Sequence, residues 1–594
     1  MINDVFAIID WNQSQPLRPW VEKISQDAIV AAGFVSEIVL DRPEICLGIV
    51  RQPNSQGGVW HQAEREIILQ GKICQGIDID SSWANLPLAE LGQNLWDGVY
   101  NLLVWCQRTQ SLLVTSDYLS IKSLYYWQQD GITVISSTLK AFRLLPWIPQ
   151  SLNPQVLAST IALSHPLSDD TLIAGVKVLP HQQAGIFKRD GIELVPRCRS
   201  QGVIEPGVST EEYLQELDRL MTESCQTWLN GSPQTLISLS GGLDSRLLLG
   251  YLKRSPTQLT AGIWGEPGSD DFKLGIELAQ ATNTEYLTYI LTENTAIAPE
   301  DLAFPGWQTE SFSVNNVPLY WRGWIELLQA QQLPVVHGFL GGPLGGGRVS
   351  KWGVTPDNLH REVDQVIVDE LTSWGQNTAP EIIQAHATAE FLPYLTTGIA
   401  EDLVKAFTSI EQPYVYQRLM GLDFYYRQRR YLGNAISKIL GTFLPTMLPF
   451  YTKNNLDFVL QLPWELISGR TIFRQLLLEQ FSGLANFQEA DKGTLPIYTN
   501  PVQKYRDRLL ENRYIWYLFP KLKPRNSALV FSLLLEKNLP LFLDTIKDSA
   551  MILSNYIDVS KLVSQLESGN LNRRDRSQIM RLFNICTFIN RYFN

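Results

Sequence analysis

The sequence predicts a two-part α/β protein, in which a β-rich first domain is followed by a parallel α/β domain and a helical C-terminal region. Short apolar or alternating runs, separated by Gly, Asp and Asn, fill the first two hundred residues, as expected for antiparallel strands. Beyond a polar, Gly- and Pro-bearing break at 199–209, strand-like runs alternate with helical runs, which is typical of a parallel sheet. From about residue 400 onward the pattern is largely helical. We therefore expect domains at residues 1–200 and 205–594.

The individual elements follow from periodicity and turn residues. The strands expected in the first domain are 5–10, 66–73, 99–106, 111–117 and 132–138, and the last of them leads into a helix-like segment at 139–145. The elements expected next are an amphipathic helix at 211–229, a strand at 235–240, a glycine loop with a helix, a strand at 258–265, a helix at 271–282 and a strand at 285–291.

Composition excludes several classes of protein. The net charge of −11 argues against nucleic acid as the main partner, because phosphate backbones require a basic surface. The basic run RQRR at 427–430 could bind a small anion, but a solvated helix face is the favoured interpretation. Six scattered cysteines without a CxxC pair predict no zinc site and fit the cytoplasm. No signal peptide and no run of eighteen apolar residues is present, so we expect no membrane association.

The string SGGLDS at residues 240–245 is the strongest chemical motif. It follows an expected strand and opens a Leu-rich helix. Backbone N–H groups in such a loop can converge on phosphate oxygens, and the helix N-terminus adds partial positive charge. Ser240 and Ser245 can add hydroxyl donors, whereas Asp244 would repel a phosphate and suits a Mg²⁺ ion that neutralises it. The motif therefore predicts a phosphate-binding loop.

SGGLDS resembles the pyrophosphate loop of ATP pyrophosphatases, and its surroundings resemble the asparagine synthetase family. Stretches similar to the family's amidotransferase motifs occur in the same order at 97–105, 116–126, 136–142 and 176–185. The resemblance runs from roughly residue 5 to residue 500. It implies a glutamine amidotransferase-like domain of the N-terminal-nucleophile type, built as a β-sandwich, followed by an ATP-pyrophosphatase domain that adenylates a carboxylate.

The same resemblance implies a set of ligands, with ATP and Mg²⁺ bound. The implied residues are Leu239, Ile263, His337 and Gly338 for the adenine pocket, Ser240, Gly241, Gly242 and Ser245 for the phosphates, Asp244 for Mg²⁺, and Lys492 for the departing pyrophosphate. For Lys492, a flexible exposed lysine is the alternative.

The glutaminase part of the family pattern is missing. The family's nucleophile is a cysteine directly after the initiator methionine, with the free α-amino group as base. Here the first ten residues contain no Cys, Ser or Thr, and Gln70 stands where the family has a glutamine-holding Asn. Cys74 is expected to be a buried thiol rather than a substitute nucleophile. We therefore expect no glutaminase activity, as in β-lactam synthetases and lasso-peptide cyclases, which the chain resembles in this respect.

The metal-binding part of the pattern also departs. The segment HGFLGGPLGGG at 337–347 is similar to the family's SGxGxDExxxGG, but Gly342 stands where the magnesium-binding Asp is expected, and Pro343 replaces the Glu. Asp270 and Asp271 could compensate, or they could be helix N-cap residues.

A third region of resemblance, 446–466, has Thr452 in place of the usual Asp. Tyr425 and Tyr426 could offer a phenol at the acceptor end, although aromatic core packing is favoured.

The predicted function is that of an ATP-dependent ligase, which adenylates a small carboxylate or peptide substrate and transfers it to ammonia or an amine. The alternative is a catalytically inactive homologue that binds a nucleotide or a partner protein. A third possibility, an ATP pyrophosphatase of thiolation or tRNA modification, is disfavoured by the acidic net charge and by the amidotransferase-like first domain.

Overall fold

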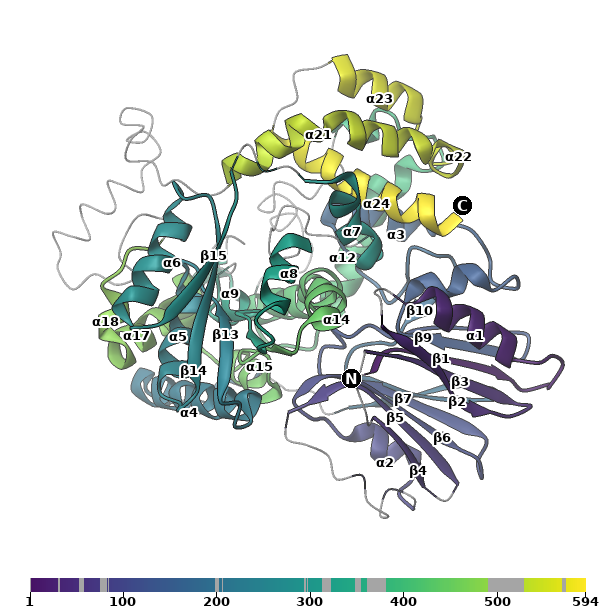
Figure 1. Cartoon of the computed structure of the whole chain (residues 1–594), viewed down its shortest axis with the longest axis horizontal. Coiled ribbons are helices and arrows are strands. Elements are labelled where there is room, and N and C mark those ends of the chain that lie inside the picture. The colour runs from purple at the N-terminus through teal and green to yellow at the C-terminus, as the bar shows by residue number, and fades with distance from the viewer. Residues whose placement is uncertain are drawn as a thin grey trace.

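The computed structural model places antiparallel sheets first in the chain, then a parallel sheet, and helices toward the C-terminus (Figure 1), which confirms the predicted order of architectures. The structure describes residues 2–29, 33–52, 58–62, 64–74, 79, 83, 85–197, 202–205, 207–292, 295, 297–311, 322–347, 354–360, 381–489, 528–568 and 573–593.

The first part contains two six-stranded antiparallel sheets, of strand order β10-β8-β9-β1-β3-β2 and β12-β11-β7-β6-β5-β4. The strands are β1 Ile2–Asp10, β2 Val35–Asp41, β3 Ile45–Arg51, β4 Val59–Gln62, β5 Arg65–Ile73, β6 Gly98–Cys106, β7 Ser111–Ser116, β8 Tyr125–Gln129, β9 Ile132–Ser136, β10 Lys177–Val178, β11 Gln183–Lys188 and β12 Gly191–Pro196. The helical elements are α1 Arg18–Asp27, α2 Leu88–Gln93, η2 Leu139–Leu144 and α3 Pro154–Leu163.

Alternation along the strands produces a four-layered arrangement. Val5, Ala7 and Ile9 of β1 point into the core between the two sheets. The opposite face of this strand packs against α1, and the outer face of the second sheet packs against α2. The predicted strands at 99–106 and 111–117 correspond to β6 and β7, whereas the helix-like segment expected at 139–145 is a 3₁₀ helix, η2.

The second part is organised around a parallel sheet of order β15-β14-β13-β16-β17. Its strands are β13 Gln234–Ser238, β14 Gln258–Gly265, β15 Glu285–Ile290, β16 Val335–Val336 and β17 Thr446–Met447. The helices within this part are α4 Thr210–Leu229, α5 Leu243–Lys253, α6 Asp270–Ala281, α7 Pro299–Gln308, α8 Arg322–Gln329 and α9 Gly341–Leu344. α6 covers the sheet at Ile263 through Gly275, whereas Trp324 of α8 packs on the other face at Gly262.

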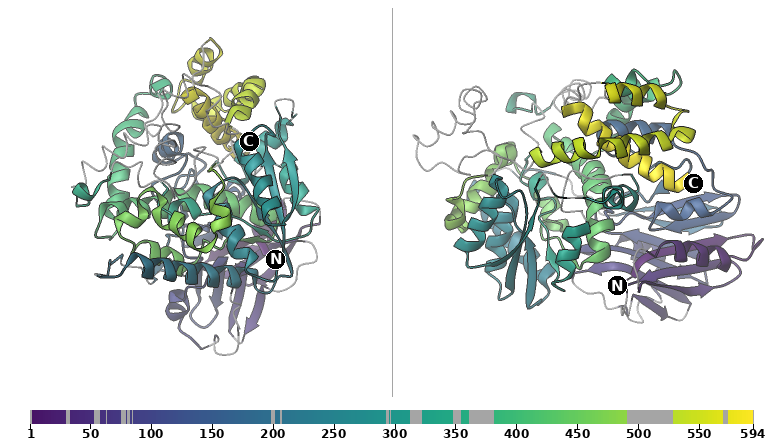
Figure 2. Two further views of the ribbon diagram at one scale, coloured as in Figure 1. Left: turned by 90° about the vertical axis from the view of Figure 1, so that its left-hand side faces the viewer. Right: turned by 45° about the horizontal axis from the view of Figure 1, so that its top comes forward.

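The remaining described residues are mostly helical, as predicted. Their elements are η5 Pro356–Asn358, α11 Glu381–Gln384, η6 Tyr394–Gly398, α12 Ile399–Thr408, α13 Val415–Leu422, η7 Asp423–Gly433, η8 Ile436–Leu440, α14 Gly441–Phe443, α15 Lys453–Val459, α16 Trp464–Ile467, η9 Ser468–Arg470, α17 Thr471–Gln480, α18 Ser482–Ala485, α21 Ala528–Asp548, α22 Ala550–Leu553, α23 Val559–Ser568 and α24 Arg573–Phe593. The C-terminal helix α24 packs along α21 and α7 (Figures 1 and 2). Within the described segments, no helix combines the length and apolarity needed to cross a membrane.

The basic run at 427–430 lies in the π-helical segment η7, and the prediction of a solvated face is wrong for its last two residues. Arg429 is 0% exposed, forms an ion pair with Asp169 at 2.9 Å and donates to the carbonyl oxygen of Leu179 at 2.6 Å. Arg430 is also buried and donates to the backbone carbonyl oxygens of Ser168 and Asp170 at 2.7 and 3.1 Å. Guanidinium groups satisfy several carbonyls at once. These arginines therefore join the helical region to the first part.

Candidate functional site

The glycine loop joins β13 to α5 at the carboxyl edge of the parallel sheet, where α/β proteins bind their ligands. Ser245 Oγ donates to the carbonyl oxygen of Ser240 at 2.9 Å, and the amide of Ser240 donates back to Ser245 Oγ at 3.2 Å. Gly242 is the N-cap of α5, and no side chain caps this helix. The amide of Gly242 donates to Ser240 Oγ at 3.2 Å, and among the described residues no side chain caps the first turn of α5, which suits an anion.

Arg246 fixes this loop from behind. Its side chain is 0% exposed, and Nη2 donates to the carbonyl oxygen of Gly241 at 2.9 Å. The same guanidinium donates to the carbonyls of Leu484, Phe487 and Gln488 at 3.3, 2.7 and 2.7 Å. Burial lowers the pKa of Arg246 to about 10, so it remains cationic at neutral pH. Arg246 was not predicted from the sequence, although a charged residue directly before the leucine run of this helix was a usable signal.

The structure brings the second glycine-rich segment, 337–347, against Asp244. A Cβ at Gly341 would lie 2.7 Å from the Asp244 side chain and 2.8 Å from Phe450, so only glycine fits there. A Cβ at Gly342 would lie 3.6 Å from Asp244 Oδ2, which is ordinary contact. An acid at position 342 would therefore stand directly beside Asp244, and its absence leaves Asp244 without a second carboxylate at this place.

The guanidinium of Arg470, rather than a second carboxylate, lies beside Asp244. Arg470 Nη2 forms an ion pair with Asp244 Oδ1, and the two side chains are 19% and 27% exposed. Arg470 also lies within 3.1 Å of a Cβ built at Gly345 and 5.7 Å from the ring of Phe473. It follows the turn at Gly469 and has a left-handed backbone, with φ of 64°. Nothing in its local sequence pattern identified it, because its partner is 226 residues away.

These residues do not fit a magnesium site as they stand. Mg²⁺ is held by carboxylate and water oxygens, but the one carboxylate here is already paired with Arg470. Among the described residues, no group of three or more His, Cys, Asp or Glu side chains could hold a metal ion. Asp270 and Asp271, the suggested substitutes, lie in the first turn of α6, whose N-cap is Ser269 rather than either acid. Magnesium therefore stays a prediction.

The residues expected around adenine occupy neighbouring strands. Leu239 and Ile263 are buried, and both lie close to Gly275 of α6. His337 and Gly338 directly follow β16, and the amide of His337 donates to the carbonyl oxygen of Met447 at 2.9 Å. Nδ1 of His337 is buried without a hydrogen-bond partner among the described residues. An unsatisfied buried nitrogen at this edge fits a base that carries its own donors and acceptors.

His337 is expected to remain neutral far below the usual range of histidine. Burial lowers the pKa of its imidazole to about 4. Its contribution to stability is therefore present above an unfolded-state pKa of about 6.5 and is lost as the pH falls toward 4. We expect the ring of His337 to keep its neutral NMR shifts at pH 5, and that signal to be missing in His337→Asn. Titration of every ring near pH 6.5 would contradict this assignment.

The start of β1 forms a separate polar cluster in the first part. Gln70 Nε2 donates to the carbonyl oxygen of Asn3, and Asn101 Nδ2 donates to Gln70 Oε1 at 2.7 Å. Asp4 accepts a hydrogen bond from Ser137 Oγ at 2.7 Å. Both ends of the Gln70 amide are thus already bound within the protein.

Comparison with known protein families matches residues 88–197 to the glutamine amidotransferase domain family. The first part of the chain contains a glutamine amidotransferase-like domain. This match confirms the coarser part of the predicted resemblance, and the relation to asparagine synthetases stays a prediction. A search of curated proteins found no match.

Two solved structures are similar to part of the chain. One is glutamine phosphoribosylpyrophosphate (PRPP) amidotransferase from B. subtilis complexed with ADP and GMP, at 10% identity and a TM-score of 0.22, over 48% of this chain and 65% of that enzyme. The other is the allosteric regulatory enzyme of purine biosynthesis, at 12% identity and a TM-score of 0.21, over 50% of this chain and 68% of the enzyme.

The absence of a glutaminase nucleophile stays a prediction, and two described residues of the amidotransferase-like domain bear on it. Ile2 at the start of this strand is buried and pairs with Arg51 of β3. Cys74 is 2% exposed, and burial raises the pKa of its thiol above the usual range. A thiol with a raised pKa is a poor nucleophile at neutral pH. The expectation that Cys74 is a buried structural thiol agrees with this environment.

The other residues singled out from the sequence have structural roles or lie outside the described residues. Thr452 caps α15 by accepting a hydrogen bond from the amide of Asn455 at 3.3 Å. Tyr425 and Tyr426 are each 8% exposed, and the ring of Tyr425 stacks on His181 at 4.4 Å. Lys492 lies outside the described residues, and its role stays a prediction.

Proposed function

We propose that the protein is an asparagine synthetase-like, ATP-dependent ligase, which adenylates a carboxylate and transfers the acyl group to ammonia or an amine. The observation that carries this proposal is the SGGLDS loop at the carboxyl edge of a parallel sheet, facing the segment 337–347. The proposal divides the chain into an amidotransferase-like domain at 1–200 and a synthetase domain at 205–594.

The proposed reaction has two steps. A carboxylate oxygen attacks the α-phosphorus of ATP, and the bond to the β-phosphate breaks, so that pyrophosphate leaves. The nitrogen nucleophile then attacks the acyl carbon, and AMP departs as the amide forms. In this scheme the backbone and hydroxyls around Ser240, Gly241, Gly242 and Ser245 bind the phosphates, because a helix N-terminus attracts negative charge.

Arg470 extends this proposal. Its guanidinium lies at the same loop as Asp244, and guanidinium groups bind phosphate oxygens in a bidentate manner. Arg470 could therefore supply positive charge to the phosphates. No step in the proposed reaction depends on a metal ion held by Asp244.

The first test is ATP–pyrophosphate exchange with a panel of candidate carboxylates, using wild type, Ser240→Ala and Asp190→Ala. We expect exchange with at least one carboxylate, a loss of about tenfold or more in Ser240→Ala, because its hydroxyl shapes the loop, and no loss in Asp190→Ala. Asp190 is exposed in the turn between β11 and β12. Glutamine should not replace ammonia as nitrogen source. Release of glutamate from glutamine by the purified protein would contradict the expectation about glutamine.

The alternative is a catalytically inactive homologue that binds a nucleotide or a partner protein. The ion pair between Asp244 and Arg470 favours it, because the pair satisfies the loop acid without metal or substrate. ATP binding by calorimetry together with no exchange for any carboxylate would favour this alternative over the ligase.

A further inference from the structure

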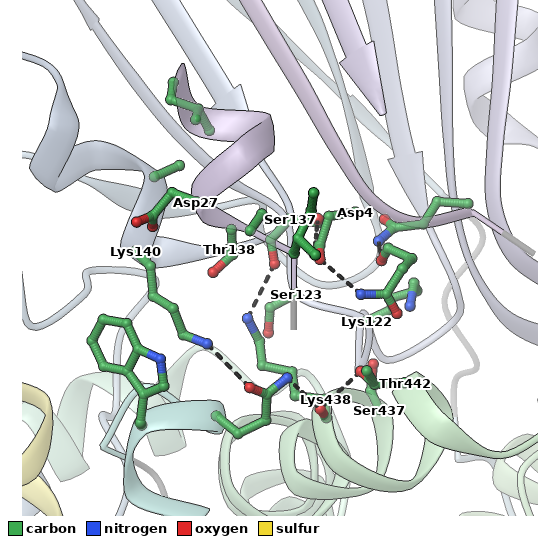
Figure 3. Close-up of a pocket in the computed structure, with 18 of the residues that line it drawn as sticks. Asp4, Asp27, Lys122, Ser123, Ser137, Thr138, Lys140, Ser437, Lys438 and Thr442 are labelled. Atoms are coloured by element: carbon green, nitrogen blue, oxygen red, sulfur yellow. Dashed lines mark hydrogen bonds between the residues drawn. The ribbon is translucent and has the colours of Figure 1, made fainter. Parts of the chain in front are cut away.

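A cavity of about 250 Å³ lies where the start of β1 meets α7 and η8 (Figure 3). We call it the β1 cavity. Its walls come from the amidotransferase-like domain on one side and from the helical region on the other. It is distinct from the glycine loop, because neither the loop nor the segment 337–347 contributes a residue to its lining.

The lining of the β1 cavity carries an excess of positive charge. Five basic residues line it, against two acids: Lys122, Lys140, Arg322, Lys438 and Arg591 against Asp4 and Asp27.

Both acids already have partners. Asp27 accepts from Arg143 at 2.5 Å, and Asp4 accepts from Ser137 at 2.7 Å and from Asn3 at 2.9 Å. Asp27 is thus paired with a cation outside the lining, whereas the partners of Asp4 are uncharged, so Asp4 is the lining acid whose charge acts on Lys122 and Lys140.

The lysines differ in how they are neutralised. Lys438 forms an ion pair with the buried Glu310 at 2.7 Å. Lys140 Nζ has the amide oxygen of Gln308 at 3.3 Å and the ring of Trp307 at 4.8 Å, and the charge of Glu310, which is paired with Lys438, also favours its cation. Figure 3 shows these two lysines and Lys122 around the same space, each from a different element.

Lys122 differs from the other two. The charges of Asp4 and Asp117 favour its cation, and the charge of Lys438 opposes it. Burial lowers the pKa of the Lys122 and Lys140 amines, and that of Lys140 falls to about 8. A Lys140 amine with this pKa is still mostly protonated at pH 7. Cations in such a place are costly unless an anion balances them.

We propose that the β1 cavity binds a small anion with carboxylate or phosphate oxygens, and that Lys122 and Lys140 are its cationic ligands. A water molecule takes about 30 Å³ in the liquid, so a cavity of about 250 Å³ has room for roughly eight waters or for an organic anion of that size. Phe304 and Trp307 provide an apolar wall for the carbon part of such a molecule. This site is independent of the proposed ligase function.

The test is calorimetric titration with two probes, inorganic phosphate and succinate, which separate the two sources of anionic oxygen. The proteins are wild type, Lys122→Gln, Lys140→Gln and Lys561→Gln, whose lysine is 75% exposed and remote from the cavity lining. We expect at least one probe to bind wild type, with affinity about tenfold lower in each cavity variant, since each loses a charge-assisted hydrogen bond, and unchanged in Lys561→Gln. No binding of either probe, or equal affinity in all four proteins, would overturn the proposal.

A second measurement uses wild type alone, in case a buried substitution prevents folding. Reductive methylation followed by mass spectrometry reports how accessible each lysine amine is. The bound probe should protect Lys122 and Lys140 and leave Lys561 unprotected. Phosphate at the glycine loop would protect neither of the two cavity lysines, and that result counts against the proposal.

Discussion

Replacing Glu310 by Gln is expected to destabilise the protein by about 3–5 kcal/mol, the typical cost of removing one partner of a buried ion pair. Glu310 is 0% exposed. Its carboxylate forms an ion pair with Lys438 at 2.7 Å and accepts hydrogen bonds from the Tyr125 hydroxyl at 2.6 Å and the Thr138 hydroxyl at 2.8 Å. The amide of Leu139 donates to it at 2.6 Å. Glu310 therefore ties the amidotransferase-like domain to the helical region.

The charge of Glu310 matters as much as its shape. Burial alone would raise the pKa of this carboxyl, but Lys438 and Lys140 offset burial and hold the pKa below its usual range. The stability that it contributes is therefore present at neutral pH, above the unfolded-state pKa, and is lost as the pH falls through the lower folded-state pKa. A glutamine at position 310 keeps the side-chain volume but leaves Lys438 and Lys140 without their anion.

Urea unfolding, followed by tryptophan fluorescence, measures the effect. Glu193→Gln is the matched control, since Glu193 is 52% exposed and pairs with Lys188 at the surface, where ion pairs contribute little. The double variant Glu310→Gln with Lys438→Met should be less destabilised than Glu310→Gln alone, because it removes one of the unpaired cations. An unfolding midpoint for Glu310→Gln equal to that of the control would contradict the structural role of Glu310.

Local patterns in the sequence predicted some elements closely and missed others, among them the strands β2, β3, β4, β8, β10, β11 and β12 of the first part. The strands at β6, β7 and β14 are apolar runs bounded by turn residues, and each was predicted to within one residue at either end. The two-residue strands β16 and β17 were also not predicted, because an alternation of period two cannot be recognised over two positions.

Long-range polar contacts explain what the sequence did not predict. Arg429 and Arg430 look like a solvated helix face, because their partners lie about 250 residues away, in the segment 168–179. Charged runs reveal nothing about burial until the fold supplies carbonyls and carboxylates around them.

In the candidate site, too, residues in local motifs were predicted and residues defined by long-range contacts were not. The motif residues of the glycine loop and the segment 337–347 were found from sequence, and the structure brings them together. Arg470 was not found, since its importance depends on the close approach to Asp244 across the fold.

Gly342→Asp is expected to raise the affinity of the loop at Asp244 for a divalent cation. The new Cβ would meet no atom closer than Asp244 Oδ2 at 3.6 Å, so the carboxylate can be accommodated beside Asp244. Two carboxylates suit a divalent cation far better than one that is paired with a guanidinium. An added charge within about 4 Å contributes several kcal/mol even at an effective dielectric constant near 20. We expect affinity for Mn²⁺, used as a probe for Mg²⁺, to rise by about tenfold to a hundredfold.

Electron paramagnetic resonance of free Mn²⁺ measures this affinity without requiring activity. Gly483→Asp is the matched control, because a Cβ at this exposed glycine meets nothing within 4 Å, whereas a Cβ at Gly342 meets Asp244. Combining Gly342→Asp with Arg470→Met should raise the affinity further, since Asp244 then loses its internal cation. If Mn²⁺ binds Gly342→Asp no better than Gly483→Asp, with or without Arg470, then Asp244 does not face a cation site. The glycine at 342 would then have no bearing on metal binding.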